Sequence, residues 1–217
     1  TVRYRRTEPQ RYEYPTPPPQ MFNLVIFDFD GTLTAPGGID FAAIRRDIEC
    51  PPTTTILEYL DTLEAEIRET AEATVNSHEL VAAAAARPNH GAEDTVLSLR
   101  RSGIRTAIIT RNNRQCFDRS LDNFTTLTPA HFEVIITRDD DLPVKPHPAG
   151  IIHAAAHVDV QLDAVLMVGD YLFDIECGRA AGVTTIWLRS DHCIPTAEDP
   201  PDHIIDHLPQ LVAIAIP

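Results

Sequence analysis

The most constraining feature of the sequence is a buried-strand pattern that ends in two carboxylates, within residues 23–34. Leu24–Phe27 is an unbroken apolar run with a β-branched centre, which is typical of a strand covered on both faces in a parallel sheet. Asp28 and Asp30 follow at once, and in extended geometry their side chains point to the same face. Open α/β sheets bind their ligands at this end of the strand.

The spacing of these acids predicts a metal. Two carboxylates on one face repel each other unless a cation lies between them or one keeps its proton, so the pair indicates a hard cation such as Mg2+. Gly31 follows and allows the backbone to turn sharply and approach a ligand closely. The alternative is an ordinary surface turn, because Asp, Gly and Thr are common turn residues.

Length and charge limit the classes of protein that remain. The 217 residues can hold one good-sized core, or one core with a small inserted subdomain, and the net charge of −14 argues against a nucleic-acid partner. No apolar run approaches the length of a membrane span, so we expect no membrane partner. The four cysteines are widely spread, which argues against a zinc knuckle or a disulfide framework and favours reduced thiols in the cytoplasm. The oligomeric state stays open.

Residues 1–20 and 35–90 differ from the strand pattern. The first twenty residues are rich in Arg, Tyr and Pro, which favours a flexible extended tail over a partner-binding arm. Residues 35–90 have helical periodicity, which predicts three helices, over residues 39–48, 55–67 and 77–87. We expect them to form a helical cap that excludes water from the mouth of the sheet. Three arginines could reach into the cleft from this cap, although solvated helix faces are the favoured interpretation: Arg45, Arg46 and Arg68.

From residue 91 onward, predicted helices and strands alternate. This alternation is typical of a doubly wound α/β fold with a parallel sheet, whose core would comprise residues 21–34 and 91–217. Strands are predicted over residues 104–109, 132–136, 164–168 and 184–188, with a short sixth strand at 204–205. Helices are predicted over residues 92–101, 114–121, 171–181 and 208–214.

Polar residues follow three of these strands. Thr110 ends one strand just before a helix, where a hydroxyl and free backbone N–H groups suit a phosphate oxygen, although Thr is also a common helix cap. Lys145 is the only lysine in a chain that otherwise uses Arg, which hints at a need for a compact point charge; the alternative is a surface lysine. Asp170 and Asp174 stand four residues apart at a strand-to-helix junction and can face one metal, unless Asp170 only caps the helix.

One further pattern carries less weight. His153 and His157 are spaced like zinc ligands on a helix, but no third ligand is evident, and a zinc site is disfavoured.

Because all these groups fall at carboxyl ends of predicted parallel strands, we expect them to converge. At this point the sequence resembles the haloacid dehalogenase superfamily, in particular its phosphoglycolate phosphatase-like hydrolases. The resemblance covers about residues 21–216 and is carried by the segments Asp28-Phe29-Asp30-Gly31-Thr32-Leu33-Thr34, Ile109-Thr110-Arg111-Asn112, Lys145-Pro146 and Gly169-Asp170 with Asp174. It implies a Rossmann-like sheet with a short helical cap inserted after the first strand.

The resemblance also implies a mechanism for hydrolysis of a small phosphorylated metabolite. Asp28 would attack phosphorus and form an aspartyl-phosphate, while Asp30 would protonate the leaving oxygen and then activate water. Thr110 and Lys145 would bind the transferring phosphoryl group, with Arg111, Asn112 and Gly31 as further substrate-binding positions. Mg2+ would be held by four aspartates: Asp28, Asp30, Asp170 and Asp174.

Three alternatives remain. A dehalogenase acts on carbon and has no need of the second acid Asp30, so that acid favours phosphate chemistry. A sugar-phosphate mutase needs the same core and differs in whether water or a second substrate reaches it. A catalytically inactive binding module is disfavoured because every expected catalytic position is filled.

Overall fold

The protein is built around one parallel sheet, seen in a computed structural model that describes residues 21–190 and 200–216. The described strands pair in the order β3-β2-β1-β4-β5-β6, and every pairing is parallel. Their bounds are β1 Leu24–Phe27, β2 Arg105–Ile109, β3 Val134–Ile136, β4 Val165–Gly169, β5 Thr184–Leu188 and β6 His203–Ile205. The prediction of a doubly wound, Rossmann-like α/β fold is therefore confirmed.

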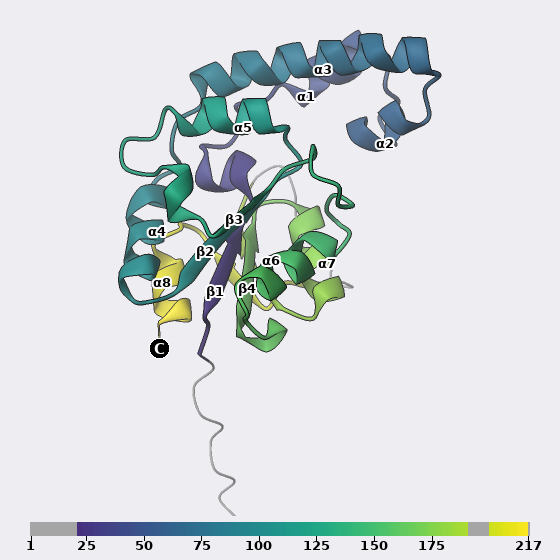
Figure 1. Ribbon diagram of the computed structural model, residues 1–217. Helices are drawn as coiled ribbons and strands as arrows, with labels where there is room; N and C mark the ends of the chain where they lie inside the picture. Colours follow the sequence, from purple (N-terminus) through teal and green to yellow (C-terminus); the bar gives the residue numbers. More distant parts are fainter. Residues whose placement is uncertain (1–20, 191–199, 217) are drawn as a thin grey trace, which may run out of the picture.

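Helices cover both faces of the sheet (Figure 1). On one face lie α4 (Ala92–Arg101) and α8 (Gln210–Ala215), and on the other lie α6 (Ala149–His157) and α7 (Leu172–Ala181). Alternate residues of β1 point to opposite faces of the sheet. Val25 and Phe27 pack in the apolar cluster on one face, and Leu24 and Ile26 pack in the cluster on the other. All four residues have no exposed surface, which explains the unbroken apolar run in the sequence.

The register of the sheet determines where the polar strand ends meet. Phe27, the last residue of β1, lies beside Ile108 in β2 and Val168 in β4. The residues that follow these three strands therefore emerge side by side, at the edge of the sheet that faces α5 (Arg114–Leu121) and the inserted segment (Figure 1).

The inserted segment, residues 35–90, lies beyond the carboxyl ends of the strands (Figure 1). It holds three helices: α1 Phe41–Asp47, α2 Ile56–Asp61 and α3 Ala65–Ala85. Its two connections to the core run side by side, with the N–H of Ala35 donating to the carbonyl of Arg87 (2.8 Å) and that of Asn89 to Leu33 (2.8 Å). That residues 35–90 form a separate cap domain stays a prediction.

The predicted division of this segment into helices was wrong in one respect. The second helix ends at Asp61 instead of continuing through Ile67, and α3 runs without a break to Ala85. The hydroxyl of Thr62 donates to the carbonyl of Tyr59 (2.7 Å) at the end of α2. No Gly or Pro interrupts residues 65–85, so one long helix forms where two were expected.

Two further predictions concern parts of the chain away from the sheet. The flexible tail, residues 1–20, lies outside the described residues. In the described part of the chain, no helix combines the length and apolar character needed to cross a membrane.

Candidate active site

The loop after β1 wraps around the first two acids. Residues 29–33 form one wide turn in which Gly31 has a φ of +85°, a conformation that side-chain-bearing residues rarely adopt. A Cβ atom at Gly31 would also lie 2.5 Å from Oδ2 of Asp170. Glycine is therefore needed here both for the turn and for the close approach of Asp170.

Lys145 joins the strand ends. Its ammonium donates hydrogen bonds to Asp28 Oδ1 and Asp174 Oδ1, both at 2.6 Å, and its side chain is 3% exposed. Burial alone would lower the pKa of Lys145, but the carboxylates of Asp174 and Asp28 outweigh burial and raise this pKa above its ordinary value. The lone lysine thus stays charged and is not the accidental surface residue considered as an alternative.

Three buried carboxylates surround this ammonium. Single oxygens of Asp28, Asp170 and Asp174 lie within 4.8 Å of one another. Burial, followed by the charges of Asp28 and Asp174, raises the pKa of Asp170 to about 8. Burial likewise raises the pKa of Asp174 to about 6. One ammonium does not offset three carboxylates, so the cluster favours a bound cation, and an all-oxygen donor set fits Mg2+.

Surrounding residues hold two of these acids in place. Asp170 accepts a hydrogen bond from the hydroxyl of Thr32 (3.1 Å), while its backbone carbonyl accepts from Trp187 Nε1 (3.3 Å) and Ser190 Oγ (2.9 Å). Asp174 Oδ2 accepts from the backbone N–H of Tyr171 (3.1 Å) at the start of α7. The alternative role of Asp170 as a helix cap is not observed, because Tyr171 occupies the cap position.

Asp30 faces the loop after β2. Its Oδ2 accepts hydrogen bonds from Thr110 Oγ1 (3.3 Å) and from Asn112 Nδ2 (3.1 Å). Burial, followed by the charge of Asp28, raises the pKa of Asp30 to about 7, so this carboxyl group exchanges a proton near neutral pH. Thr110 does not cap the following helix, because Asn113 does so by accepting from the N–H of Cys116 (2.7 Å).

Arg111 lies at the boundary between the core and the inserted segment. Its Nη2 donates to both carboxylate oxygens of Glu58 in α2, at 2.9 and 3.0 Å. A second contact across this boundary joins Arg138 to Glu79 in α3, with two hydrogen bonds of 2.7 Å. Glu58, Glu79 and Arg138 were not singled out in the sequence, because helical periodicity does not say which charged residues face the core.

The arginines considered as cap residues reach other targets. Arg45 donates to the carbonyls of Pro51 (2.8 Å) and Thr54 (2.5 Å) within its own segment. Arg46 pairs with Asp47, and Arg68 pairs with Asp61 and Glu72.

His153 and His157 also lie outside the site. Their rings stack on α6 with centroids 6.4 Å apart. Among residues 21–190 and 200–216, the only group of three potential metal ligands is the aspartate cluster, to which neither histidine belongs.

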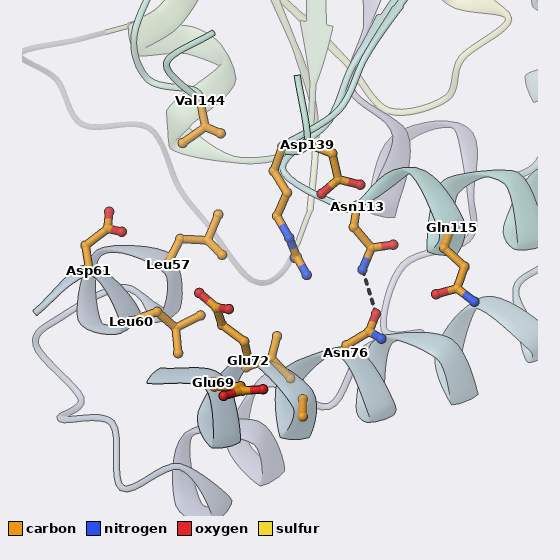
Figure 2. A pocket seen from close by; sticks show the side chains of 13 residues that line it. Leu57, Leu60, Asp61, Glu69, Glu72, Asn76, Asn113, Gln115, Asp139 and Val144 are labelled. Atoms are coloured by element: carbon orange, nitrogen blue, oxygen red, sulfur yellow. Dashed lines mark hydrogen bonds between the residues drawn. The ribbon is translucent and has the colours of Figure 1, made fainter. Parts of the chain in front are cut away.

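A cleft of about 660 Å³ opens between the inserted segment and the core (Figure 2). Figure 2 shows Leu57, Leu60 and Asp61 from α2 on one wall, with the amide of Asn113 directed at Asn76 of α3 (2.8 Å). None of the predicted catalytic residues lines this cleft. It borders the site through Asn113 and Val144, which adjoin Asn112 and Lys145 in the chain.

The fold and the site define a doubly wound α/β protein with a cluster of buried acids at the carboxyl edge of its parallel sheet, and comparison with known proteins gives the family. Residues 25–188 match the haloacid dehalogenase-like hydrolase family, so the chain belongs to this family and the resemblance found in the sequence is confirmed. The prediction of a hydrolase is likewise confirmed.

Relatives agree with this assignment, and a solved structure agrees with the fold. An uncharacterized hydrolase of Saccharomyces cerevisiae is 34% identical over 170 residues, which cover 76% of this chain and 77% of the yeast protein. Pyrophosphatase PpaX of Halalkalibacterium halodurans is 29% identical, with 88% and 96% covered. A crystal structure of a haloacid dehalogenase-like hydrolase from Bacteroides fragilis has the same fold, with a TM-score of 0.72 and 24% identity over 88% of this chain and 99% of that one.

Proposed function

We propose that the protein is a Mg2+-dependent phosphatase that hydrolyses a small phosphorylated metabolite in the cytoplasm through an aspartyl-phosphate on Asp28. The observation that carries the proposal is the position of the Lys145 ammonium, 2.6 Å from both Asp28 and Asp174 and buried with them. A fixed positive charge beside a carboxylate lets a phosphoryl dianion approach that carboxylate.

In this proposal Asp28 is the nucleophile. Its free oxygen attacks phosphorus, the bond from phosphorus to the leaving oxygen breaks, and Lys145 balances the charge that gathers on the phosphoryl oxygens. The hydroxyl of Thr110, which donates to Asp30 in the structure, would turn to donate to the phosphoryl group when substrate binds. The Asp28 carboxylate is recovered when water cleaves the aspartyl-phosphate.

Asp30 is the acid and base of the same cycle. It gives a proton to the leaving oxygen and later takes one from the attacking water. Asn112 donates to the carboxyl group of Asp30 at 3.1 Å, so this group stays beside the loop after β2 when Thr110 turns to the phosphoryl group. Asp28 as nucleophile and Asp30 as acid and base are separated by one residue, and the turn at Gly31 follows them directly.

Mg2+ would be held by carboxylate oxygens of Asp28, Asp170 and Asp174 and by the backbone carbonyl of Asp30, whose carboxyl group stays free for proton transfer. The ion would neutralise charge on the phosphoryl oxygens. Support for this choice comes from the all-oxygen donor set and from the excess of buried carboxylates over ammonium groups.

Names of relatives support phosphate chemistry without identifying the substrate. One relative at 35% identity over 80 residues, which cover 36% of each chain, is phosphoglycolate phosphatase of Nitrosococcus oceani, and another is pyrophosphatase PpaX. Both names denote hydrolysis of a small phosphorylated compound.

The test is release of inorganic phosphate from p-nitrophenyl phosphate and from a panel of sugar phosphates, phosphoglycolate, pyrophosphate, nucleotides and amino-acid phosphates, with and without Mg2+. We expect Mg2+-dependent release by the wild type, a loss of about 10⁴-fold or more in Asp28→Asn, and nearly complete loss in Asp30→Asn. Asp118→Asn, an exposed acid on α5, is the matched control and should keep its activity.

The outcomes separate the alternatives. Wild-type rates in Asp28→Asn would exclude the nucleophile, and isomerised sugar phosphate without phosphate release would identify a mutase. Phosphate release from no member of the panel would favour a binding module.

A further inference from the structure

Arg111 contacts more of the site than its place next to Thr110 suggests. Its Nη1 donates to the backbone carbonyl of Lys145, and its Nη2 donates to Glu58 at 2.9 and 3.0 Å. The guanidinium also lies over the ring of Phe173, with Cζ 4.4 Å from the ring centroid. One side chain, itself 18% exposed, thus joins the loops after β2 and β3 to helix α7 and to helix α2 of the inserted segment.

The hydrogen bond from Arg111 holds the backbone of Lys145, whose ammonium carries the proposed function. The Lys145 ammonium must lie between Asp28 and Asp174, but the side chain that carries it is long and flexible. Its position is therefore only as well defined as the backbone from which it extends. In the same loop, the Cys177 thiol donates to the carbonyl of His147 (3.2 Å), so Arg111 and Cys177 hold neighbouring carbonyls.

The contact with Glu58 links this support to the inserted segment. Glu58 belongs to α2 of the inserted segment, not to the core. In the structure Glu58 holds Nη2 and thereby directs Nη1 toward the Lys145 carbonyl. Without Glu58 in this place, the guanidinium would lose its counter-charge and could turn from that carbonyl toward water.

We infer that Arg111 is a positioning residue that couples docking of α2 through Glu58 to placement of the Lys145 ammonium, an inference that rests on the proposed phosphatase function. Only a guanidinium fits this role, because its planar fork donates in two directions while its face lies on an aromatic ring. The Arg138 side chain serves a different loop, since it donates to Glu79 and, at 3.5 Å, to the carbonyl of Arg111.

Steady-state hydrolysis of p-nitrophenyl phosphate with Mg2+ tests the inference in Arg111→Met, Glu58→Gln and the double variant. We expect kcat to fall about 30-fold in Arg111→Met with KM changed by less than about threefold, and to fall about fivefold in Glu58→Gln. The double variant should match Arg111→Met within about twofold, because both changes break one unit. Arg111→Lys should not restore kcat.

The matched control is Arg114→Met. Arg114 lies three residues further along, pairs with Asp118 at 3.0 Å and lies over the Phe117 ring at 5.8 Å, but its side chain is 49% exposed on α5. Its removal should change kcat by less than about twofold. A rise in KM alone for Arg111→Met would make Arg111 a substrate ligand, and additive effects of the two changes would overturn the coupling.

Hydrogen exchange of the free protein gives a readout that does not depend on activity. Amides in residues 144–150 should exchange at least about fivefold faster in both Arg111→Met and Glu58→Gln than in Arg114→Met. Faster exchange of α2 alone in Glu58→Gln would overturn the coupling. Should the wild type release no phosphate while exchange changes as expected, the proposed function fails and the coupling of α2 to the Lys145 loop stands.

Discussion

The core and the inserted segment use charged side chains in opposite ways. In the core, Lys145 and Asp174 are 3% and 1% exposed and have fixed partners on more than one loop. In the inserted segment, Arg46 and Asp47 are 72% and 39% exposed. Exposed pairs in water contribute little, whereas buried charges depend on every partner. The comparison indicates that the proposed reaction depends on the buried charges of the core. The inserted segment influences these charges where Glu58 and Glu79 contact the core.

Replacing one basic side chain in each region should give the largest difference in kcat. Lys145→Met should lower kcat by about 10³-fold, because Asp28 and Asp174 then face a phosphoryl group without a counter-charge. Lys145→Arg should not restore the rate, since a planar fork does not replace a point charge. Phosphate release is the measurement, with circular dichroism to show that the fold is kept.

Arg46→Met is the control in the inserted segment. Arg46 pairs with Asp47 on α1, and the two side chains are 72% and 39% exposed. We expect its kcat to stay within about twofold of the wild type. Similar losses in both variants would show that the two regions do not differ in the way described.

Two glycines with the same backbone conformation offer a second contrast. Gly31 and Gly37 have φ of +85° and +80°, so alanine strains both by about 1–2 kcal/mol. At Gly31 the new Cβ would also lie 2.5 Å from Asp170, whereas at Gly37 no atom lies within 4 Å. Gly31→Ala should therefore lower kcat by about 10²-fold.

Gly37→Ala separates strain from displacement of Asp170. It should lose stability, measured by urea unfolding, while phosphate release changes by less than about twofold. Equal losses of activity in the two variants would mean that backbone strain, and not the position of Asp170, determines the effect.

The core and the inserted segment also differ in how well each could be predicted from the sequence. Asp28 and Asp170 could be placed in advance because they follow apolar strands, and parallel strands in register bring their carboxyl ends together. Lys145 could be singled out because it is the only lysine and lies in the loop after the third predicted strand. The contact of Asn112 with Asp30 could not, because a substrate oxygen and a carboxylate are equally good acceptors for its amide.

The inserted segment was less predictable for a physical reason. Apolar spacing predicted helices there, but not the end of α2 at Asp61, because a hydroxyl at Thr62 that bonds to the preceding turn is a weak signal. Without that break the orientation of α2 is unknown, and so is the contact of Glu58 with Arg111. The residues through which this segment reaches the core thus emerged only from its tertiary packing.

Two glutamates on α3 test that packing directly. Glu79 is 9% exposed and pairs with Arg138, which is 17% exposed, whereas Glu72 is 55% exposed. Glu79→Gln should lower the free energy of unfolding by about 2 kcal/mol, because it leaves the Arg138 guanidinium buried without a counter-charge. Glu72→Gln should lower it by less than about 0.5 kcal/mol. Urea unfolding measures both, and equal values would mean that the Glu79 contact does not hold α3 on the core.

The smallest effect concerns a half-buried acid of the core, Glu93 on α4. Its Oε1 accepts hydrogen bonds from the N–H of Thr126 (2.6 Å), the hydroxyl of Thr126 (3.0 Å) and the N–H of Leu127 (3.2 Å). Partial burial raises the pKa of Glu93, but these hydrogen bonds outweigh it and hold the pKa below its ordinary value. Ionised Glu93 therefore stabilises the fold above the pKa of the unfolded chain, and this contribution is lost as the pH falls through the lower folded pKa.

Glu93→Gln should consequently lower Tm by about 2–4 °C at pH 7, and the difference from the wild type should shrink as the pH falls below the ordinary pKa of a glutamate and through the lowered folded pKa. Thermal unfolding of both proteins from pH 7 downward is the measurement. Asp118→Asn, whose side chain is 48% exposed on α5, is the control and should show a small difference that varies little with pH. A Glu93 difference that stays constant with pH would mean that the side chain acts through shape and neutral hydrogen bonds, and that even in the core a carboxylate needs deeper burial than this before its charge stabilises the fold.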